Sequence, residues 1–341
     1  MIVDGILTAA AVDPIVESIS RYEEAGYGGV WAGETSHDPF LPLAIAAEHS
    51  KRIGLGTCIA VAFARNPMLL ATVGNDLQTF SRGRFALGLG SQVKAHVQRR
   101  FSMAWSNPAA RMRELIQAVH AIWDAWETGE PLNFRGDFYT HTLMTPFFDP
   151  GPNLFGRPKV FLAAVGEQMT QVAGEVADGM FVHGFSTPRY IRHVTLPALK
   201  QGLDASGRPR TAIEVSYPGL VATGRDEQEM ANAVEQVRRQ VSFYGSTPTY
   251  RPVLELHGWG ALAEELTRLS RCDEGARWDT MAALIDDEVL NEFAIVASLE
   301  DLGTVVRERL DGLVDRFMLA LPVGVDAETQ QTVIAAARGG D

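Results

Sequence analysis

The sequence predicts a (β/α)8 barrel, on three observations. Short apolar runs rich in β-branched residues recur along the 341 residues, and segments with helical periodicity separate them. The runs are almost continuously apolar, as strands are in a parallel sheet whose two faces are both covered. The alternation repeats eight times, which favours a closed barrel over the alternative, an open doubly wound sheet.

The predicted strands and helices follow one another regularly, and proline marks the start of several helices. The strands cover residues 3–9, 28–33, 53–62, 85–90, 159–165, 179–185, 213–223 and 316–323. The helices cover residues 14–25, 39–51, 67–81, 107–127, 167–177, 187–204, 226–243 and 326–337. Proline at a first helical position loses no hydrogen bond, because the N–H of that position has no partner within the helix. The prolines placed in this way are Pro14, Pro39, Pro67, Pro108 and Pro188.

Two stretches interrupt the repeat and are predicted to be insertions. Residues 129–158 are rich in glycine, proline and aromatic side chains. Residues 245–297 hold two further helical patterns, near 258–271 and 279–292. Long loops in a barrel often cover its mouth, and they equally serve as surface decoration or as a dimer contact. No linker divides the chain, so we expect one domain, residues 1–341.

The charge balance argues against nucleic-acid and membrane-surface binding. Lys and Arg total 30 against 42 Asp and Glu, and the net charge of −12 repels phosphate backbones and anionic lipid. No stretch approaches about 18 uncharged apolar residues, and Asp4 lies where a signal peptide would carry a basic residue. Cys58 and Cys272 are far apart and form no CxxC pair, which predicts neither a disulfide framework nor a cysteine zinc site. We therefore expect a cytoplasmic enzyme that acts on a small molecule.

Polar residues gather where the predicted strands end, and barrel enzymes react at the carboxyl ends of their strands. These segments are 34–38, 58–67, 88–96, 163–168 and 183–186. Gly166 stands immediately before a predicted helix, where the backbone of a glycine can approach a ligand and the first-turn N–H groups face it. This turn is the best candidate for a phosphate site, although Glu167 would oppose an anion unless it points away.

Motifs of several common mechanisms are absent from the sequence. It holds no GxGxxG, GxxxxGK[ST], HExxH or GxSxG pattern, and the nearest stretch, residues 88–93, lacks the third glycine. Nicotinamide-dinucleotide, ATP-binding, zinc-protease and serine-hydrolase mechanisms therefore have no motif support.

Taken together, the strand ends resemble the luciferase-like monooxygenase superfamily, and within it the coenzyme F420-dependent oxidoreductases. The most specific matches are residues 81–90 (SRGRFALGLG), 55–59 with 65–67, and 163–166 followed by 173–179. The resemblance runs from the first strand to the last helix. Residues 34–39 and 90–96 are similar to a subgroup presumed to use the deazaflavin F420.

The resemblance implies a flavin-like ring in the mouth of the barrel and assigns residues to it. It implies a non-prolyl cis peptide between Cys58 and Ile59 behind the ring, and a phosphate site at the Gly166 turn. It places Glu34 near the polar edge of the ring and His96 as a polar contact after strand four. The residues assigned to the cofactor are Glu34, Cys58, Ile59, Gly90, Ser91, His96, Ala164, Val165, Gly166, Glu167 and Gln168.

The chain departs from these relatives at two positions that matter for proton transfer. Relatives that oxidise alcohols commonly carry a histidine directly after the acid, where this chain has Thr35, and some carry a carboxylate where Val93 stands. Glu34 and His96 are therefore the first catalytic candidates. His37 could replace the missing base if its loop turns inward.

The same residues also have structural interpretations. Glu34 is otherwise a solvated loop acid, and His96 and His37 are otherwise structural histidines. Cys58 is best interpreted as a small apolar strand residue, not a nucleophile, because no partner histidine follows a neighbouring strand. Arg65 either neutralises a cofactor anion or pairs with a neighbouring acid, and we favour the pair.

We expect hydride transfer between C5 of F420 and a small organic substrate, because a deazaflavin has carbon in place of flavin N5. One alternative is an FMN-dependent monooxygenase that receives reduced flavin from a separate reductase. The other is a barrel that only carries a flavin-like ligand. The resemblance also implies a homodimer packed through helices of the first half of the barrel. The apolar residues 41–47 are compatible with that contact and equally with ordinary core.

Overall fold

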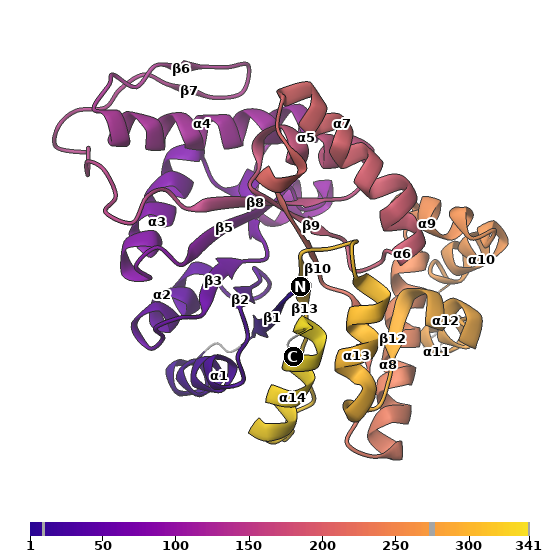
Figure 1. Cartoon of the computed structure of the whole chain (residues 1–341). Coiled ribbons are helices and arrows are strands. Elements are labelled where there is room, and N and C mark those ends of the chain that lie inside the picture. Colours follow the sequence, from indigo (N-terminus) through magenta and orange to yellow (C-terminus); the bar gives the residue numbers. More distant parts are fainter. Residues whose placement is uncertain (9–10, 273–276, 340–341) are drawn as a thin grey trace. The chain divides into compact units, whose positions relative to one another are not determined.

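The structure is a computed structural model that describes residues 1–8, 11–272 and 277–339. Its chain forms two compact units, which we describe separately. Unit 1 comprises Met1–Val3, Val182–Leu196 and Ser216–Asp341, and unit 2 comprises Asp4–Phe181 and Pro197–Val215. Figure 1 labels their helices and strands.

Unit 2 holds most of the barrel strands and their connecting helices. Parallel pairing joins β1 to β2, β2 to β3, β3 to β5 and β5 to β8, and β9 follows β8 in the strand order. The short β4 continues the third strand and also pairs with β5. The strands are β1 Ile2–Leu7, β2 Gly29–Ala32, β3 Gly54–Thr57, β4 Ala60–Val61, β5 Phe85–Gly90, β8 Lys159–Ala164 and β9 Gly179–Val182.

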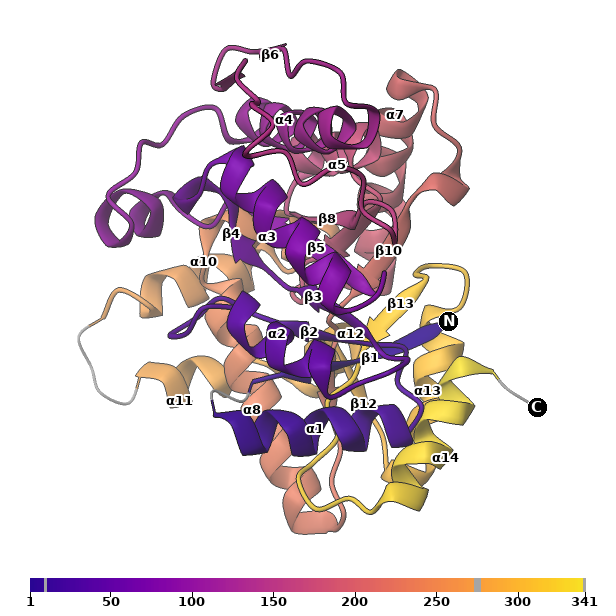
Figure 2. The same ribbon diagram turned by 90° about the vertical axis from the view of Figure 1, so that its left-hand side faces the viewer.

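Apolar faces place the unit 2 helices against these strands. Helix α1 buries Ile15, Ile19 and Tyr22, which recur at helical spacing. Helix α3 starts as predicted, with Pro67 in its first turn and the Asn66 side chain accepting a 2.9 Å hydrogen bond from the amide of Leu69. Figure 2 shows α1, α2 and α3 side by side over the first strands. The helices are α1 Val12–Glu24, α2 Phe40–Glu48, α3 Pro67–Phe80, α4 Pro108–Thr128, α5 Glu167–Val176 and α7 Leu196–Ser206.

Three aromatic rings fill the core of unit 2. The ring centroids of Trp31, Phe161 and Phe181 lie 4.9 to 5.2 Å apart, and all three side chains are almost completely buried. The indole N–H of Trp31 donates to the buried carboxylate of Asp4 at 2.9 Å. A packed interior of this kind directs ligands to the strand ends and away from the barrel axis.

Unit 1 holds the remaining strands and the second insertion. Strands β10 and β13 pair in parallel, and so do β11 and β12. Phe293 of the insertion stacks on Phe185, which follows β9, at 4.3 Å within a separate apolar core of unit 1. The elements are β10 Glu214–Tyr217, β11 Leu220–Ala222, β12 Ala294–Val296, β13 Arg316–Met318, α6 Pro188–Tyr190, α8 Glu227–Gly245, α9 Arg251–Leu256, α10 Gly260–Leu269, α11 Arg277–Ala282, α12 Asp287–Phe293, α13 Leu299–Leu310 and α14 Ala327–Arg338.

The predicted (β/α)8 fold is confirmed, since every predicted barrel strand is present and is followed by a helix. The strands predicted over 179–185 and 316–323 end earlier, at Val182 and Met318. Three other predicted elements divide into shorter ones. Residues 53–62 divide into β3 and β4, and residues 213–223 divide at Pro218, which has no N–H to donate to a ladder. Residues 187–204 divide into α6, a π-helical turn at Ile191–Thr195 and α7.

The two predicted insertions are present, and each has more structure than expected. Residues 129–158 form an antiparallel hairpin of β6 Phe134–Arg135 and β7 Thr140–His141, and Glu114 of α4 accepts three backbone N–H bonds from this region. The expected helix near 279–292 is two helices, α11 and α12. Helix α13 and strand β12 were missed altogether.

Candidate active site

The end of the third strand contains the peptide geometry that the resemblance implies. The Cys58–Ile59 peptide bond is cis, and neither residue is proline. The amide of Cys58 donates to the carbonyl of Ala32 at 2.8 Å, and the carbonyl of Ile59 accepts from the amide of Glu34 at 3.1 Å. The backbone that follows β2 therefore fixes both sides of this peptide, and the prediction of its position is confirmed.

Two glycines of β5 make room for this strand end. A Cβ on Gly88 would lie 1.7 Å from the carbonyl oxygen of Thr57, and a Cβ on Gly90 would lie 2.8 Å from Cγ1 of Ile59. The hydroxyl of Thr57 donates to the carbonyl of Gly88 at 2.7 Å and accepts from its amide at 2.8 Å. The Thr57 side chain thus replaces ladder hydrogen bonds where β3 ends, a role that the sequence analysis missed.

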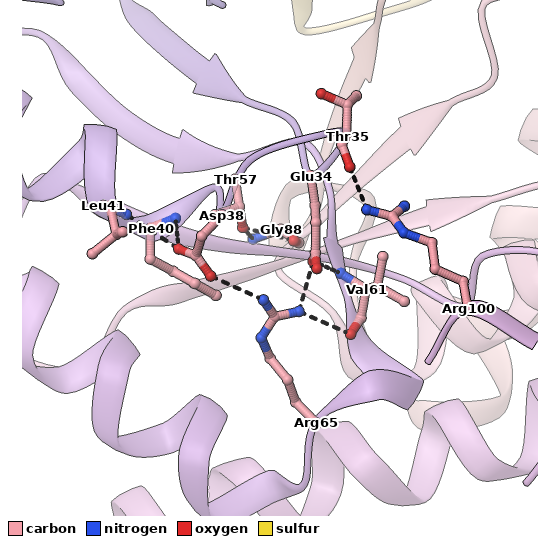
Figure 3. Close-up of polar contacts among 10 residues, drawn as sticks. All are labelled: Glu34, Thr35, Asp38, Phe40, Leu41, Thr57, Val61, Arg65, Gly88 and Arg100. Atoms are coloured by element: carbon pink, nitrogen blue, oxygen red, sulfur yellow. Dashed lines mark hydrogen bonds and ion pairs between the residues drawn. The ribbon is translucent and has the colours of Figure 1, made fainter. Parts of the chain in front are cut away.

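Glu34 lies directly after β2 and binds the loop after β4 (Figure 3). Its Oε2 accepts from the amide of Val61 at 2.7 Å and from Nη1 of Arg65 at 2.6 Å, and its side chain is only 8% exposed. Nη2 of Arg65 also donates to Asp38 at 3.2 Å. Arg65 therefore pairs with two neighbouring acids, as favoured from the sequence, and Glu34 is not a solvated loop acid.

Asp38 connects the same network to a helix. Its other carboxylate oxygen accepts from the amides of Phe40 at 2.8 Å and Leu41 at 3.2 Å, at the start of α2. The guanidinium of Arg65 lies over the Phe40 ring, 5.3 Å from its centroid. One arginine thus links the loop after β2, the loop after β4 and the first turn of α2.

The two candidate histidines lie on exposed segments. His37 follows Glu34 within a loop whose residues Thr35 to Asp38 are exposed. His96 is exposed at the start of a π-helical turn, His96–Arg100, in which Val97 is buried. Within residues 1–8, 11–272 and 277–339, neither imidazole has a hydrogen-bond partner. Both side chains are therefore accessible, and their expected roles in proton transfer stay predictions.

The Gly166 turn has the features expected of an anion site. Gly166 is the N-cap of α5 at φ +79°, no side chain caps the helix, and nothing lies within 4 Å of the position of an added Cβ. Val165, Glu167 and Gln168 are exposed, whereas Ala164 is buried at the end of β8. The first-turn N–H groups of a helix have no partner within it, so those of α5 are available to a ligand.

Strand register brings the candidate segments of unit 2 together. Ala32 aligns with Thr57, Val61 aligns with Gly90, and Leu89 aligns with Leu162 across parallel pairs. The segments that begin at Glu34, Cys58, Gly90, Ser91 and Ala164 therefore leave the sheet at the same edge. His183 and Ser186 belong to unit 1 and have partners there.

His183 is held in a defined orientation in unit 1. Its Nδ1 accepts from the amide of Phe185 at 3.1 Å, and its Nε2 lies 3.0 Å from the hydroxyl of Tyr250, on which the ring also stacks. Desolvation lowers the pKa of His183 to about 4. The imidazole is therefore neutral and carries its proton on Nε2, which fits a structural role in unit 1.

The environment of Cys58 agrees with its interpretation as an unreactive strand residue. Desolvation raises the pKa of its thiol to about 12, and the carboxylate of Asp4 contributes in the same direction. The thiolate, which is the nucleophilic form, is therefore negligible at neutral pH. In the described part of the chain, no group of three metal-binding side chains occurs, and no helix is long and apolar enough to cross a membrane.

Comparison with known proteins identifies the family. The model of the family described as luciferase-like monooxygenase matches residues 3–317. An uncharacterised protein of Mycobacterium tuberculosis is 53% identical over 314 residues, 92% of this chain and 90% of that protein. A 5,10-methylenetetrahydromethanopterin reductase of Archaeoglobus fulgidus is 25% identical over 310 residues, 89% of this chain and 88% of the reductase.

A solved structure has the same fold. The coenzyme F420-dependent tetrahydromethanopterin reductase from Methanopyrus kandleri superposes with a TM-score of 0.78 at 21% identity, covering 97% of this chain and 96% of that one. The family match and the sequence identity extend over nearly the whole barrel. The chain therefore belongs to the luciferase-like monooxygenase family of oxidoreductases.

Proposed function

We propose that the chain is an F420-dependent oxidoreductase that transfers a hydride between C5 of the deazaflavin and a small organic substrate. The observation that carries the proposal is the uncapped, open Gly166 turn at the strand edge that also carries Glu34 and Gly90. The similarity to a methylenetetrahydromethanopterin reductase supports it.

The residues present fit a deazaflavin with a phosphate tail. The Cys58–Ile59 backbone is half-buried, the amide of Glu34 donates to the carbonyl of Ile59, and the Ile59 side chain fills the space that Gly90 leaves. Ser91 and His96 follow β5 at the same strand edge, and we assign them to the ring as well. The tail would lie at the exposed α5 N-terminus, with the backbone of Ala164, Val165, Gly166, Glu167 and Gln168. When bound, the deazaflavin supplies the two-electron hydride chemistry.

The chain's own residues would position the ring and move the accompanying proton. Glu34 holds Arg65 and the amide of Val61, so we assign it the positioning of the strand end beside the ring. His96 is accessible, and a histidine can exchange protons near neutral pH, so we assign the proton transfer to it. His37 is the second candidate for the same task, from the opposite loop.

A binding experiment tests the proposed function. The protein is titrated with F420, FMN and FAD in parallel, and the shift in thermal unfolding is measured. Ligand at a hundred times its dissociation constant stabilises by about 2.7 kcal/mol, which ranks the three clearly. We expect F420 to stabilise most. Preference for FMN would favour the monooxygenase alternative, and no stabilisation by any of the three would reject the proposal.

A pair of variants tests where the phosphate tail of F420 binds. Gly166→Ala is the test variant, and Gly207→Ala is its control. Both glycines have positive φ, +79° and +69°, with open space at the Cβ position, but Gly166 also has ψ 160°, a region that alanine adopts at a high cost. The binding of the two variants is therefore compared after thermal unfolding has verified that both are folded. We expect Gly166→Ala to weaken F420 binding about tenfold through the displaced phosphate contacts, which corresponds to about 1.4 kcal/mol. Gly207→Ala should leave binding unchanged.

We also propose a homodimer formed through α2 and α3. Helix α2 carries one charged residue, Glu48, at its last position. Leu41 of α2 and Leu69 of α3 are 69% and 59% exposed. An exposed, nearly uncharged helical surface is typical of a contact between subunits.

A further inference from the structure

The chain between Asp76 and Glu114 has a charge balance opposite to that of the whole protein. Residues 77–113 contain seven Lys and Arg and no Asp or Glu, whereas the full sequence has 42 acidic residues against 30 basic ones. This segment includes β5 and the loop that leaves its carboxyl end. Positive charge is therefore concentrated beside the proposed site of an otherwise acidic protein.

Three of the seven basic side chains already have structural partners. Arg84 donates to backbone carbonyls between α2 and β3. Arg113 of α4 pairs with Glu175 of α5. Nε of Arg111 donates to the hydroxyl of Tyr139 at 2.9 Å. Their charges serve the packing of helices and loops.

Lys94, Arg99 and Arg100 differ, and we call them the 94–100 cluster. All three are exposed and lie within one short stretch after β5, whereas Arg82 lies in the turn that precedes β5. In the parts of the chain that the structure describes, no carboxylate forms an ion pair with any of the three. Within these parts of the chain, no direct ion pair therefore compensates the charge of this cluster.

A π-helical turn holds the cluster together. The amide of Phe101 donates to the carbonyl of His96 at 3.0 Å, the i to i+5 bond of such a turn, and buried Val97 anchors it. Arg99 and Arg100 lie within this turn, and Lys94 precedes it by two residues. Single π-helical turns occur often at functional sites.

Arg100 connects the cluster to the loop after β2. Nη2 of Arg100 donates to the carbonyl of Thr35, which follows Glu34 directly (Figure 3). The acids of this loop, Glu34 and Asp38, are both bound to Arg65. One guanidinium is shared by two carboxylates, so the loop keeps about one unit of negative charge opposite the three cations of the cluster.

The cluster is also separate from the proposed phosphate position. Gly166 follows β8, which pairs with β5 on the side away from β3 and β2. Arg100 reaches in the other direction, toward the end of β2. We therefore expect an anion bound beside Arg100 to be distinct from the phosphate at the α5 N-terminus.

From this arrangement we propose that the 94–100 cluster binds an anionic group of the substrate, a carboxylate or a phosphate ester. The inference rests on the proposed function, because it names the substrate class of that same site. The net charge of −12 repels anions at long range, so a local cationic patch is what attracts and orients them. His96 lies between Lys94 and Arg99 in the chain, beside the bound group.

Calorimetric titration tests the cluster with defined probes. Benzoate, its neutral analogue benzamide and inorganic phosphate are titrated into the F420-bound protein at low ionic strength. The test variant is Lys94→Gln with Arg99→Gln, and Arg100 is kept because it holds the loop at Thr35. The control is Lys51→Gln with Arg52→Gln, an equal charge change on two exposed residues that precede β3.

We expect benzoate and phosphate to bind the wild type and the control alike. The Lys94→Gln, Arg99→Gln variant should bind both about three- to tenfold more weakly, as the loss of two partly exposed ion pairs predicts. The affinity for benzamide should be the same in all three proteins. Added salt should remove the difference in anion affinity between the variant and the wild type. Equal anion affinity in all three proteins, or no anion binding by the wild type, would reject the proposal.

The 94–100 cluster could instead bind the anionic tail of the cofactor. Titration of F420 distinguishes this alternative from binding of an anionic substrate group. If the test variant weakens F420 binding and the anions compete with F420, the cluster binds the tail and the proposal is wrong. If the proposed function is wrong, the protein binds no F420. Benzoate binding to the cluster can then still be measured in the protein without cofactor.

Discussion

Oε2 of Glu34 and Nη1 of Arg65 lie 2.6 Å apart, in a pair of side chains that are 8% and 19% exposed. The residues are 31 positions apart in the chain and meet because parallel strands β2 and β3 end at the same edge. A family assignment alone would place Glu34 against the ring. The structure shows that its carboxylate also holds the loop after β4, so its loss affects stability as well as binding.

Replacing Glu34 with Gln should destabilise the fold by about 1–3 kcal/mol, because the guanidinium of Arg65 loses a charged acceptor in a largely buried place. Urea denaturation measures the change. Asp204→Asn is the control, since it removes the exposed Lys200–Asp204 pair and should cost less than about 1 kcal/mol. Equal losses in the two variants would contradict this role of Glu34.

Replacing Gly90 with Ala should weaken cofactor binding about tenfold or more, because the new methyl group would lie 2.8 Å from Cγ1 of Ile59 and must displace that residue. The dissociation constant of F420 measures the effect. Gly129→Ala adds the same methyl group into open space at a φ of +71°, and it is the control for binding once thermal unfolding has verified that the variant is folded. Unchanged binding by Gly90→Ala would show that Ile59 does not contact the cofactor.

The stability of the protein should fall at high pH through Cys58. Its folded-state pKa of about 12 lies above the ordinary value of 9.0, so the stabilisation is complete below pH 9 and is lost as the pH rises toward 12. At pH 10 the loss is about 1.4 kcal/mol. The difference in unfolding free energy between wild type and Cys58→Ala, measured at pH 8 and pH 10, should shrink by this amount. A constant difference would disprove the shift.

Acid should destabilise unit 1 through His183. Its folded-state pKa of about 4 lies below the ordinary 6.5, so its contribution is present above pH 6.5 and is lost as the pH falls through 4. The loss between pH 7 and pH 4 is about 2–3 kcal/mol. His183→Gln should flatten the acid limb of the stability curve, and replacement of the exposed His193 by Gln should not. If both variants lost stability with falling pH in the same way as the wild type, His183 would not be neutral in the folded protein.

The double variant Leu41→Glu, Leu69→Glu should halve the mass measured by light scattering, because charge on these exposed residues prevents burial of the α2–α3 surface. Val323 is 89% exposed in unit 1, and Val323→Glu is the control that should leave the mass unchanged. A monomeric wild type would reject the proposed dimer.

The sequence predicted what depends on local pattern and on the order of the strands. The apolar runs located the barrel strands, and the prolines located the start of α3. The pairing of Arg65 was predictable because a buried or half-buried arginine near a strand end usually pairs with an acid that follows a neighbouring strand. Which acid it binds, and that it binds Glu34 and Asp38 together, required the folded loops.

Features that depend on contacts across strands were missed. Thr57 lies in an apolar run, and nothing in that run shows that its hydroxyl bonds to both backbone groups of Gly88. Helix α13 had a local signal, since the Ser298 hydroxyl accepts from the amide of Asp301 in an acidic first turn. It was overlooked because the preceding insertion obscured where the barrel pattern resumes.

Arg65 is shared by two carboxylates, so the loop after β2 keeps about one unit of negative charge while the segment after β5 carries three cations. These opposite charges flank the strand ends and form a permanent electric dipole along the rim. A diffusing molecule with one anionic end experiences a torque there before it makes contact, and it arrives with that end turned toward Lys94, Arg99 and Arg100. The encounter is then partly oriented, and raising the salt concentration should slow productive capture more than it weakens the final complex.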